Sequence, residues 1–120
     1  MVKILVVDDS ESNRLFVKEF LGGLGHTVIQ AENGSVGLKI ILKEHPDLVI
    51  TDLAMPVMDG AQMVDRATSS GSVIPFIMIS GHVGDMKELL KHHPALLKVK
   101  AFLKKPINLK KLEEIVKANL

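Results

Sequence analysis

Cysteine, tryptophan and tyrosine are all absent from the 120 residues. Without cysteine the chain can form no disulfide, thiol nucleophile or cysteine-ligated metal centre. No apolar run approaches the roughly 20 residues of a membrane-spanning helix. The chain enters a strand-like pattern directly, at Lys3–Val7, with no signal peptide ahead of it. We therefore expect a soluble, cytoplasmic protein that makes no contact with a membrane.

The charge is balanced in total but not along the chain. The formal net charge of +1 gives no indication of nucleic-acid binding. Residues 1–60 carry five basic and nine acidic side chains, net −4, whereas residues 61–120 carry ten basic and five acidic, net +5. Carboxylates are thus concentrated in the first half and lysines in the second, an asymmetry that the net charge hides.

Apolar strand-sized segments alternate with helix-sized segments from end to end. Several of the strand segments lack polar alternation, which is typical of a parallel sheet covered on both faces. Five βα units with right-handed crossovers predict a single α/β domain over residues 1–120, a doubly wound parallel sheet with five helices. The predicted strands are Lys3–Val7, Thr27–Ala31, Leu48–Thr51, Ile74–Ile79 and Val99–Lys104.

Periodicity and capping residues predict the helices. In the first, an apolar series recurs every four residues and glycines mark the end. Asn33 is predicted to cap the second helix, and Asp59-Gly60 opens a third toward Ser69. The predicted apolar faces comprise Phe16, Phe20 and Leu24 in the first helix, Val36, Ile40 and Ile41 in the second, Met86, Leu89 and Leu90 in the fourth, and Leu109, Leu112, Val116 and Leu120 in the last.

Chemically capable side chains follow the strands where each one ends. They are Asp8, Asp9, Asp52, Ser80 and Lys105. Open α/β sheets build their sites at this edge, so neighbouring first and third strands would bring three carboxylates together. Like charges so close raise one another's pKa unless a cation joins them. An oxygen-only cluster of this kind suits Mg²⁺.

The same edge can hold a phosphoryl group. A lysine and a hydroxyl suit a tetrahedral anion attached to one of the carboxylates. Aspartate is an established nucleophile that forms an acyl phosphate, and charge stabilisation supplies most of the catalysis in phosphoryl transfer. Taken singly, Asp9 or Asp52 after a strand is more often just a helix cap, and the combination at four strand ends favours the phosphoryl-accepting site.

The sequence resembles the response-regulator receiver domain of two-component signalling over essentially its whole length, and three segments carry the resemblance. They are Lys3–Asp9, Asp52–Gly60 (DLAMPVMDG) and Phe102–Pro106 (FLKKP). The resemblance implies a flavodoxin-like sheet of order 2-1-3-4-5. It also implies that Asp52 is the phosphoacceptor and that Asp8, Asp9, Asp52 and the Ala54 carbonyl hold Mg²⁺. Such domains are phosphoacceptors with intrinsic autodephosphorylation rather than classical enzymes.

The resemblance further implies a switch. Lys105 would contact the phosphoryl oxygens and Ser80 would hydrogen-bond one of them. Movement of Ser80 would let Phe102 rotate from an exposed to a buried position, changing the face formed by the fourth helix, the fifth strand and the last helix. The Lys105–Pro106 bond would be cis, and Ala54 and His82 would tune the rates of phosphorylation and hydrolysis.

Partners follow from the same resemblance. A sensor histidine kinase or a histidine phosphotransfer protein would supply the phosphoryl group, and a downstream protein would bind the switching face. The chain would be a monomer or a phosphorylation-dependent dimer. The pair Asn13-Arg14 and the string Met55–Gly60 (MPVMDG) resemble receivers attached to hybrid kinases, whereas the Met1 start favours a free-standing regulator, so both forms stay open.

The sequence departs from the common receiver pattern before the fifth strand. The usual Gly-Ala pair is replaced around Leu97–Lys100, and the interval from Ser80 to Lys105 is longer than is typical. A receiver that has kept the pocket but serves only as a binding module is a further alternative.

Two other functions are compatible with the fold class. A flavin protein would need a Ser/Thr/Gly-rich phosphate loop after the first strand, where this chain has two aspartates. A phosphatase with an aspartate nucleophile would need Asp-x-Asp there, which is absent.

Overall fold

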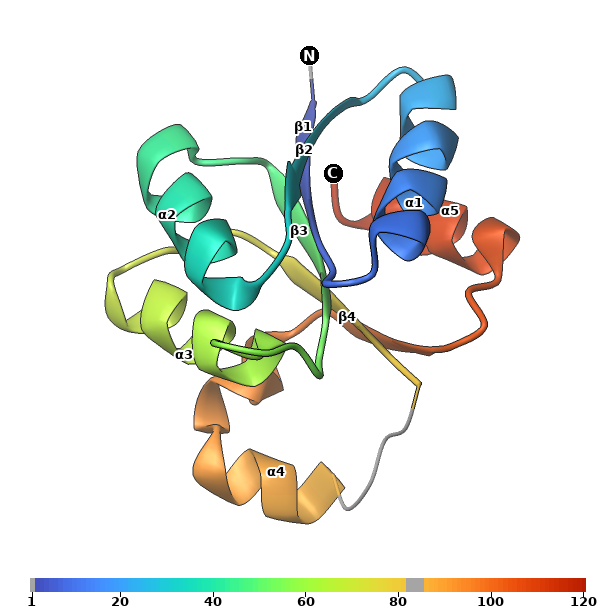
Figure 1. Ribbon diagram of the computed structural model, residues 1–120. Coiled ribbons are helices and arrows are strands. Elements are labelled where there is room, and N and C mark those ends of the chain that lie inside the picture. The colour runs from blue at the N-terminus through green and yellow to red at the C-terminus, as the bar shows by residue number, and fades with distance from the viewer. Residues whose placement is uncertain (1, 82–85) are drawn as a thin grey trace.

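The computed structural model describes residues 2–81 and 86–120. Its sheet is parallel with the strand order β2-β1-β3-β4-β5, as predicted. Because every strand runs in the same direction, all the carboxyl ends meet at one edge, the lower edge in Figure 1. The strands are β1 (Lys3–Val7), β2 (Thr27–Ala31), β3 (Leu48–Asp52), β4 (Phe76–Ser80) and β5 (Ala101–Lys104).

Helices cover both faces of the sheet. Figure 1 shows α1 and α5 on one side and α2 and α3 on the other, with α4 below. The bounds are α1 (Glu11–Gly23), α2 (Gly34–Glu44), α3 (Gly60–Ser69), α4 (Met86–His92), a 3₁₀ helix η1 (Pro94–Lys98) and α5 (Leu109–Ala118). In the part of the chain that is described, none of these helices combines the length and the apolar character needed to span a membrane.

Polar caps fix where four of the helices begin. Each capping side chain accepts a hydrogen bond from the backbone N–H three residues later, satisfying a donor that the first helical turn leaves free. The caps are Ser10, Asn33, Asp59 and Asn108, as predicted for Asn33, and the third helix begins at Asp59-Gly60 as predicted. Asp59 also forms a reciprocal capping box with Gln62. These caps hold the helix starts close to the carboxyl edge of the sheet.

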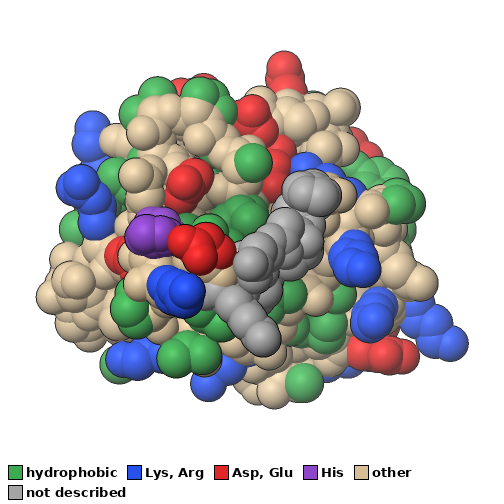
Figure 2. Space-filling model, turned by 90° about the horizontal axis from the view of Figure 1, so that it is seen from below, with side chains coloured by type: hydrophobic (Ala, Val, Ile, Leu, Met, Phe, Trp, Pro, Cys, Tyr) green, Lys and Arg blue, Asp and Glu red, His purple; other side chains and the backbone are tan. Residues whose placement is uncertain are grey.

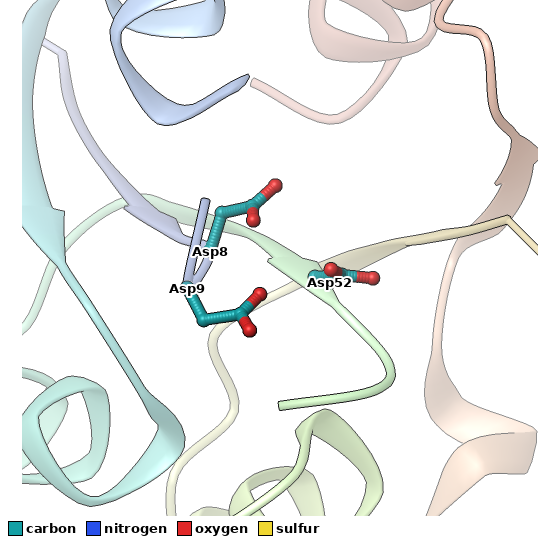
Figure 3. A group of neighbouring side chains, drawn as sticks. All are labelled: Asp8, Asp9 and Asp52. Carbon is teal, nitrogen blue, oxygen red and sulfur yellow. The ribbon is translucent and has the colours of Figure 1, made fainter. Parts of the chain in front are cut away.

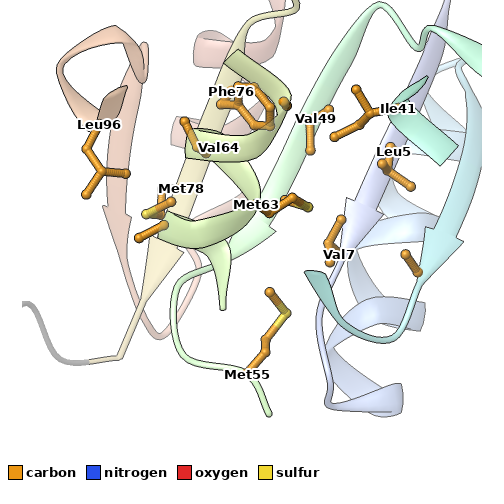
Figure 4. Packing of buried hydrophobic residues seen from close by; sticks show 13 residues of the cluster. Leu5, Val7, Ile41, Val49, Met55, Met63, Val64, Phe76, Met78 and Leu96 are labelled. Atoms are coloured by element: carbon orange, nitrogen blue, oxygen red, sulfur yellow. The ribbon is translucent and has the colours of Figure 1, made fainter. Parts of the chain in front are cut away.

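Alternate strand residues feed two separate apolar layers. Ile4 and Val6 point toward α1 and α5, where they pack with Leu112 and other buried residues. Leu5 and Val7 point the other way, toward α2 and α3, and Figure 4 shows this second layer, including Met63 and Phe76. The near-continuous apolar strands of the sequence are explained by this burial on both faces.

The predicted apolar face of α1 was right for Phe20, which packs against the core, and wrong for its other two residues. Phe16 and Leu24 are exposed, whereas Val17 and Leu21 are buried. The inner face of the helix also carries Arg14, whose guanidinium bonds to the first loop and to β2. Positions 14, 17 and 21 share one helical face, so the polar anchor fixed a rotation that the apolar spacing alone did not reveal.

The strand bounds and one helix also differ from the prediction. β3 continues through Asp52, β4 is Phe76–Ser80 rather than Ile74–Ile79, and β5 begins at Ala101 rather than Val99. The residues before β5 form η1, whose Leu96 is buried in the α2–α3 layer. The extra residues before the fifth strand therefore form a short helix that packs against the core, which the sequence pattern did not predict.

Candidate phosphoacceptor site

Three carboxylates meet where β1 and β3 end. Asp8 and Asp9 follow β1 directly and Asp52 is the last residue of β3. The strands are neighbours, with Val7 in register with Thr51, so one oxygen from each carboxylate lies within 4.8 Å of the others. Figure 3 shows the side chains of all three directed into the same space. The prediction that these carboxylates lie together is confirmed.

Backbone contacts hold the acidic residues differently. The Asp8 N–H donates to the Ala31 carbonyl at 3.1 Å, and Asp8 Oδ1 accepts from the Ser10 N–H at 2.9 Å. Asp8 and Asp52 are buried, with 6% and 7% of their surface exposed, whereas Asp9 is exposed. The cluster therefore has a buried base formed by two carboxylates and a third that faces solvent.

Lys105 brings the matching positive charge from the far end of the chain. Its Nζ lies 3.0 Å from Asp52 Oδ2 and 3.9 Å from Asp8 Oδ2. Its backbone N–H donates to the Ser80 carbonyl at 3.0 Å, which ties the segment after β5 to the end of β4. The Lys105–Pro106 peptide bond is cis, as the resemblance implied.

Burial and charge act in opposite directions on the two sides of this ion pair. Burial raises the pKa of Asp8 above its ordinary value of 3.8, and the Ser10 hydrogen bond and the charge of Lys105 offset only part of this rise. Burial works to lower the pKa of Lys105, but its hydrogen bond to Asp52 and the negative charges around it outweigh burial and raise it. The lysine is thus held charged, as an anion-binding group requires.

The donor set fits a hard divalent cation. Three carboxylates offer only oxygen, the ligand that Mg²⁺ prefers, and the exposed side of the cluster leaves room for the waters that this ion retains. Burial and the neighbouring carboxylates disfavour the charged form of Asp8, and a bound cation would offset that cost. Ala54 lies two residues after Asp52 in the β3–α3 loop, where its backbone could contribute a further oxygen.

Acidic and basic groups share this edge of the sheet. Figure 2 views the molecule from the carboxyl ends of the strands and shows red Asp and Glu side chains and blue Lys and Arg side chains on the same face. The opposite net charges of the two halves of the sequence are thus brought onto one surface by the fold.

Ser80 and Phe102 lie on the same face of the sheet. Met78 is in register with Phe102 and Ser80 with Lys104, and alternate residues of a strand share a face. Ser80 is buried, whereas Phe102 on the edge strand has 39% of its surface exposed. His82, to which a rate-tuning role was assigned, lies outside the described residues.

The loop after Asp52 packs tightly against the strand that carries it. The Gly60 N–H donates to the Leu53 carbonyl at 2.8 Å, and a Cβ at Gly60 would lie 2.3 Å from the Asp52 carbonyl oxygen. Only glycine fits this approach. Within the loop, the exposed Val57 has a positive φ of 71°, which is uncommon for a β-branched residue.

Sequence reasoning missed the contact of Arg14. Its Nη1 donates to the Asp8 carbonyl at 2.7 Å and its Nε donates to Gln30 Oε1 at 3.2 Å. The contact could have been predicted from the position of Arg14, one helical turn after the Ser10 cap. A helical side chain at that position points back toward the loop that precedes the helix.

The sheet order and the carboxylate–lysine edge are those of receiver domains in two-component signalling. The chain matches the response regulator receiver domain over residues 4–117 and belongs to this family. Sporulation initiation phosphotransferase F of Bacillus subtilis is 31% identical over 118 residues, which cover 98% of this chain and 93% of that protein. The structure of the chemotaxis protein CheY4 of Vibrio cholerae is similar, with a TM-score of 0.84, 31% identity, and coverage of 100% of this chain and 99% of that one.

Other relatives are far longer than this chain. The autoinducer 1 sensor kinase/phosphatase LuxN of Vibrio campbellii is 34% identical over 82 residues, which are 68% of this chain and 10% of that protein. The chain thus spans about a tenth of the length of such sensor kinases. The family consists of signalling phosphoacceptors rather than classical enzymes; its members bind Mg²⁺ in an acidic pocket and interact with histidine kinases or phosphotransfer proteins.

Proposed function

We propose that Asp52 accepts a phosphoryl group from a histidine-bearing donor protein. The observation that carries this proposal is the position of Asp52, which lies within 4.8 Å of two further carboxylates on one side and 3.0 Å from Lys105 Nζ on the other. The acyl phosphate formed on this buried carboxylate would be anionic, and Lys105 together with a cation held by the three carboxylates would balance its charge.

The step itself is a substitution at phosphorus. An oxygen of ionised Asp52 forms a bond to phosphorus as the bond from phosphorus to the donor's imidazole nitrogen breaks, and the electron pair of that bond leaves with the imidazole. Lys105 and the Ser80 hydroxyl then stabilise oxygens of the new acyl phosphate. Water attack on the same phosphorus reverses the modification, which gives the domain its autodephosphorylation.

Asp8, Asp9, Asp52 and the Ala54 carbonyl would hold Mg²⁺. When bound, the ion neutralises the carboxylates and the charge that develops on the transferred group. The chain's own contribution is to hold these oxygens together: the Ser10 N–H fixes the Asp8 carboxylate, and the close approach of Gly60 fixes the loop that carries Ala54.

A cleft beside Lys105 gives the donor a place to approach. It has a volume of about 260 Å³ and is lined by Asn13, Phe16, Lys105, Pro106 and Ile107. Phe16 is half exposed there, so an apolar surface lies next to the cation that contacts Asp52. These features support a sensor histidine kinase or a phosphotransfer protein as the partner.

We further propose that the signal leaves through the surface formed by α4, β5 and α5. Ser80 and Phe102 share a sheet face, and Phe102 is exposed in the present structure. Movement of Ser80 toward the phosphoryl group would open space for Phe102 to turn inward. The exposed Lys104 and Lys111 line a hollow next to Phe102, which suits an acidic surface on a downstream protein.

The proposal covers residues 1–120 as one receiver domain. Such a domain serves as a free-standing regulator or as part of a hybrid sensor kinase. The similarity to segments of long sensor kinases supports the second form. A binding module without phosphorylation has no observation in its favour, because Asp52, Lys105 and the acidic pair are all in place.

The decisive experiment is intact mass spectrometry after incubation with acetyl phosphate and Mg²⁺. Wild type should gain the mass of one phosphoryl group and Asp52→Asn should gain none. Asp47→Asn is the matched control, because Asp47 is exposed just before β3, at the opposite end of the strand from Asp52. Equal labelling of wild type and Asp52→Asn would contradict the assignment of Asp52. Absence of labelling in wild type, both with acetyl phosphate and with a phosphorylated histidine phosphotransfer protein, would favour the binding module.

A further inference from the structure

Arg14 links three parts of the fold at the acidic edge. It lies on α1, and its guanidinium donates to the Asp8 carbonyl at 2.7 Å and to Gln30 Oε1 on β2 at 3.2 Å. Gln30 is itself fixed in the sheet, in register with Val6. Both bonds are partly buried, and within the described residues Arg14 forms no ion pair. Its Nη1 and Nε are therefore directed at a backbone oxygen and a neutral amide.

The Asp8 carbonyl is held by a hydrogen bond directly before the chain reaches Asp9. The residue-by-residue pairing of β1 with its neighbours ends at Val7, so the Asp8 carbonyl must find its partner outside the ladder. Arg14 is that partner, and the Asp8 N–H on the other side donates to Ala31. Because a peptide unit is planar, fixing the carbonyl of Asp8 also fixes the N–H of Asp9 and the direction in which Asp9 leaves the strand.

Asp9 needs this support more than its neighbours do. Asp8 has the Ser10 N–H on its carboxylate, and Asp52 has Lys105. The Asp9 side chain is exposed, and no hydrogen bond or ion pair of its carboxylate is found among the described residues. Its alignment with the other two carboxylates therefore depends on its backbone.

We propose that Arg14, braced by Gln30, is a positioning residue that holds Asp9 in the metal-binding arrangement of the three carboxylates. This inference rests on the proposed function only in taking Mg²⁺ as the ion of that cluster. Arg14 would touch neither the metal nor the phosphoryl group. Its effect would be to reduce the number of directions available to the Asp9 carboxylate before the ion arrives, so that less order has to be imposed on binding.

The test is Mg²⁺ binding by isothermal titration calorimetry, with no phosphoryl donor present. Arg14→Met keeps the length and apolar stem of the side chain and removes its donors. We expect it to weaken Mg²⁺ binding about tenfold, as loss of supporting groups around metal ligands does elsewhere. Arg66→Met is the matched control, since Arg66 is exposed on α3 and its side chain forms no bond within the described residues. The control should bind Mg²⁺ as wild type does.

A second readout separates positioning from general damage to the fold. In Arg14→Met, the rate of labelling by acetyl phosphate should fall at low Mg²⁺ and return to the wild-type rate at saturating Mg²⁺. Wild-type Mg²⁺ affinity in a folded Arg14→Met would overturn the proposal. So would a labelling rate that stays low when the ion is saturating, because the defect would then lie beyond metal binding.

Two milder variants decide the matter if the methionine variant does not fold. Arg14→Lys can reach one acceptor but cannot bridge both, and Gln30→Met removes the brace while leaving the arginine. Each should weaken Mg²⁺ binding about threefold, the effect of one hydrogen bond, and wild-type affinity in both would overturn the proposal. A wild type that binds Mg²⁺ but accepts no phosphoryl group would contradict the proposed function and leave this inference standing. A wild type that binds no Mg²⁺ would contradict the metal assignment and overturn this inference with it.

Discussion

Asp8 bears a large part of the electrostatic cost of the acidic edge. Its pKa is raised first by burial and then by the charges of Asp52 and Asp9, while Ser10 and Lys105 offset only part of that rise. A carboxyl group whose pKa is higher in the folded than in the unfolded chain binds protons more tightly when folded. Stability is therefore lost as pH rises from the unfolded pKa through the folded one, and the cost is complete above the folded pKa.

The first prediction is that Asp8→Asn stabilises the metal-free protein. Asparagine keeps the shape and an acceptor for the Ser10 N–H but removes the buried charge. In EDTA at neutral pH the melting temperature should rise by a few degrees, measured by circular dichroism because the chain has no tryptophan or tyrosine. Glu114→Gln, which removes the same charge from an exposed position on α5, should leave the melting temperature unchanged. A lower melting temperature in Asp8→Asn would mean that its contact with Lys105 outweighs its burial.

At the scale of elements, η1 is the part of the molecule that sequence pattern predicted least well. It fills the interval between α4 and β5, and Leu96 projects from it into the layer shared with α2 and α3, with 1% of its surface exposed. His93 contacts Asp65 on α3, and its N–H closes α4 onto the Leu89 carbonyl at 2.9 Å. This short helix thus joins α4, an element of the proposed output surface, to α3.

The second prediction concerns this junction. Leu96→Ala should lower the free energy of unfolding by about 2–4 kcal/mol, because it leaves a cavity in a packed layer. The neighbouring Leu97 has 76% of its surface exposed, so Leu97→Ala should change that free energy by less than about 0.5 kcal/mol. Urea denaturation followed by circular dichroism measures both. Similar losses in the two variants would show that η1 does not anchor the segment through Leu96.

In the whole molecule, acidic residues predominate in the first half of the chain and basic residues in the second, and the fold brings members of both groups together. Asp8 and Asp52 belong to the half with net charge −4, and Lys105 belongs to the half with net charge +5. The parallel sheet places the ends of β1, β3 and β5 at one edge, where Lys105 is the main protein cation among the carboxylates. One lysine near three carboxylates leaves an excess of negative charge that a divalent cation would balance.

The third prediction follows from this excess. A ligand that binds only the folded state stabilises it by mass action, so Mg²⁺ at ten times its Kd should add about 1.4 kcal/mol and raise the melting temperature by about 5 °C. Asp9→Asn should remove most of that rise, whereas Glu11→Gln, an exposed acid at the start of α1, should keep it. Thermal melts with Mg²⁺ and with EDTA give the comparison. A full rise in Asp9→Asn would count against Asp9 as a ligand.

The sequence by itself determined the succession of strands and helices along the chain and the chemical groups at the strand ends. Strands buried on both faces are apolar almost throughout, and helix caps are short polar residues, so the strand Lys3–Val7, the cap Asn33 and the helix start at Asp59-Gly60 were predicted from local pattern. The three carboxylates could be assigned to one edge because parallel strands share a direction. Their distances could not, since these depend on the register between β1 and β3.

Only the tertiary structure decided what depends on contacts between distant segments. The rotation of α1 was set by the bonds of Arg14 to Asp8 and Gln30, so the residues that the helix buries differ from the most regular apolar series. The start of β5 was set by η1, whose buried Leu96 packs in the apolar layer shared with α2 and α3. Periodicity records how residues repeat along one element, whereas these outcomes depend on the shape and hydrogen-bonding groups of a neighbour that is remote in sequence.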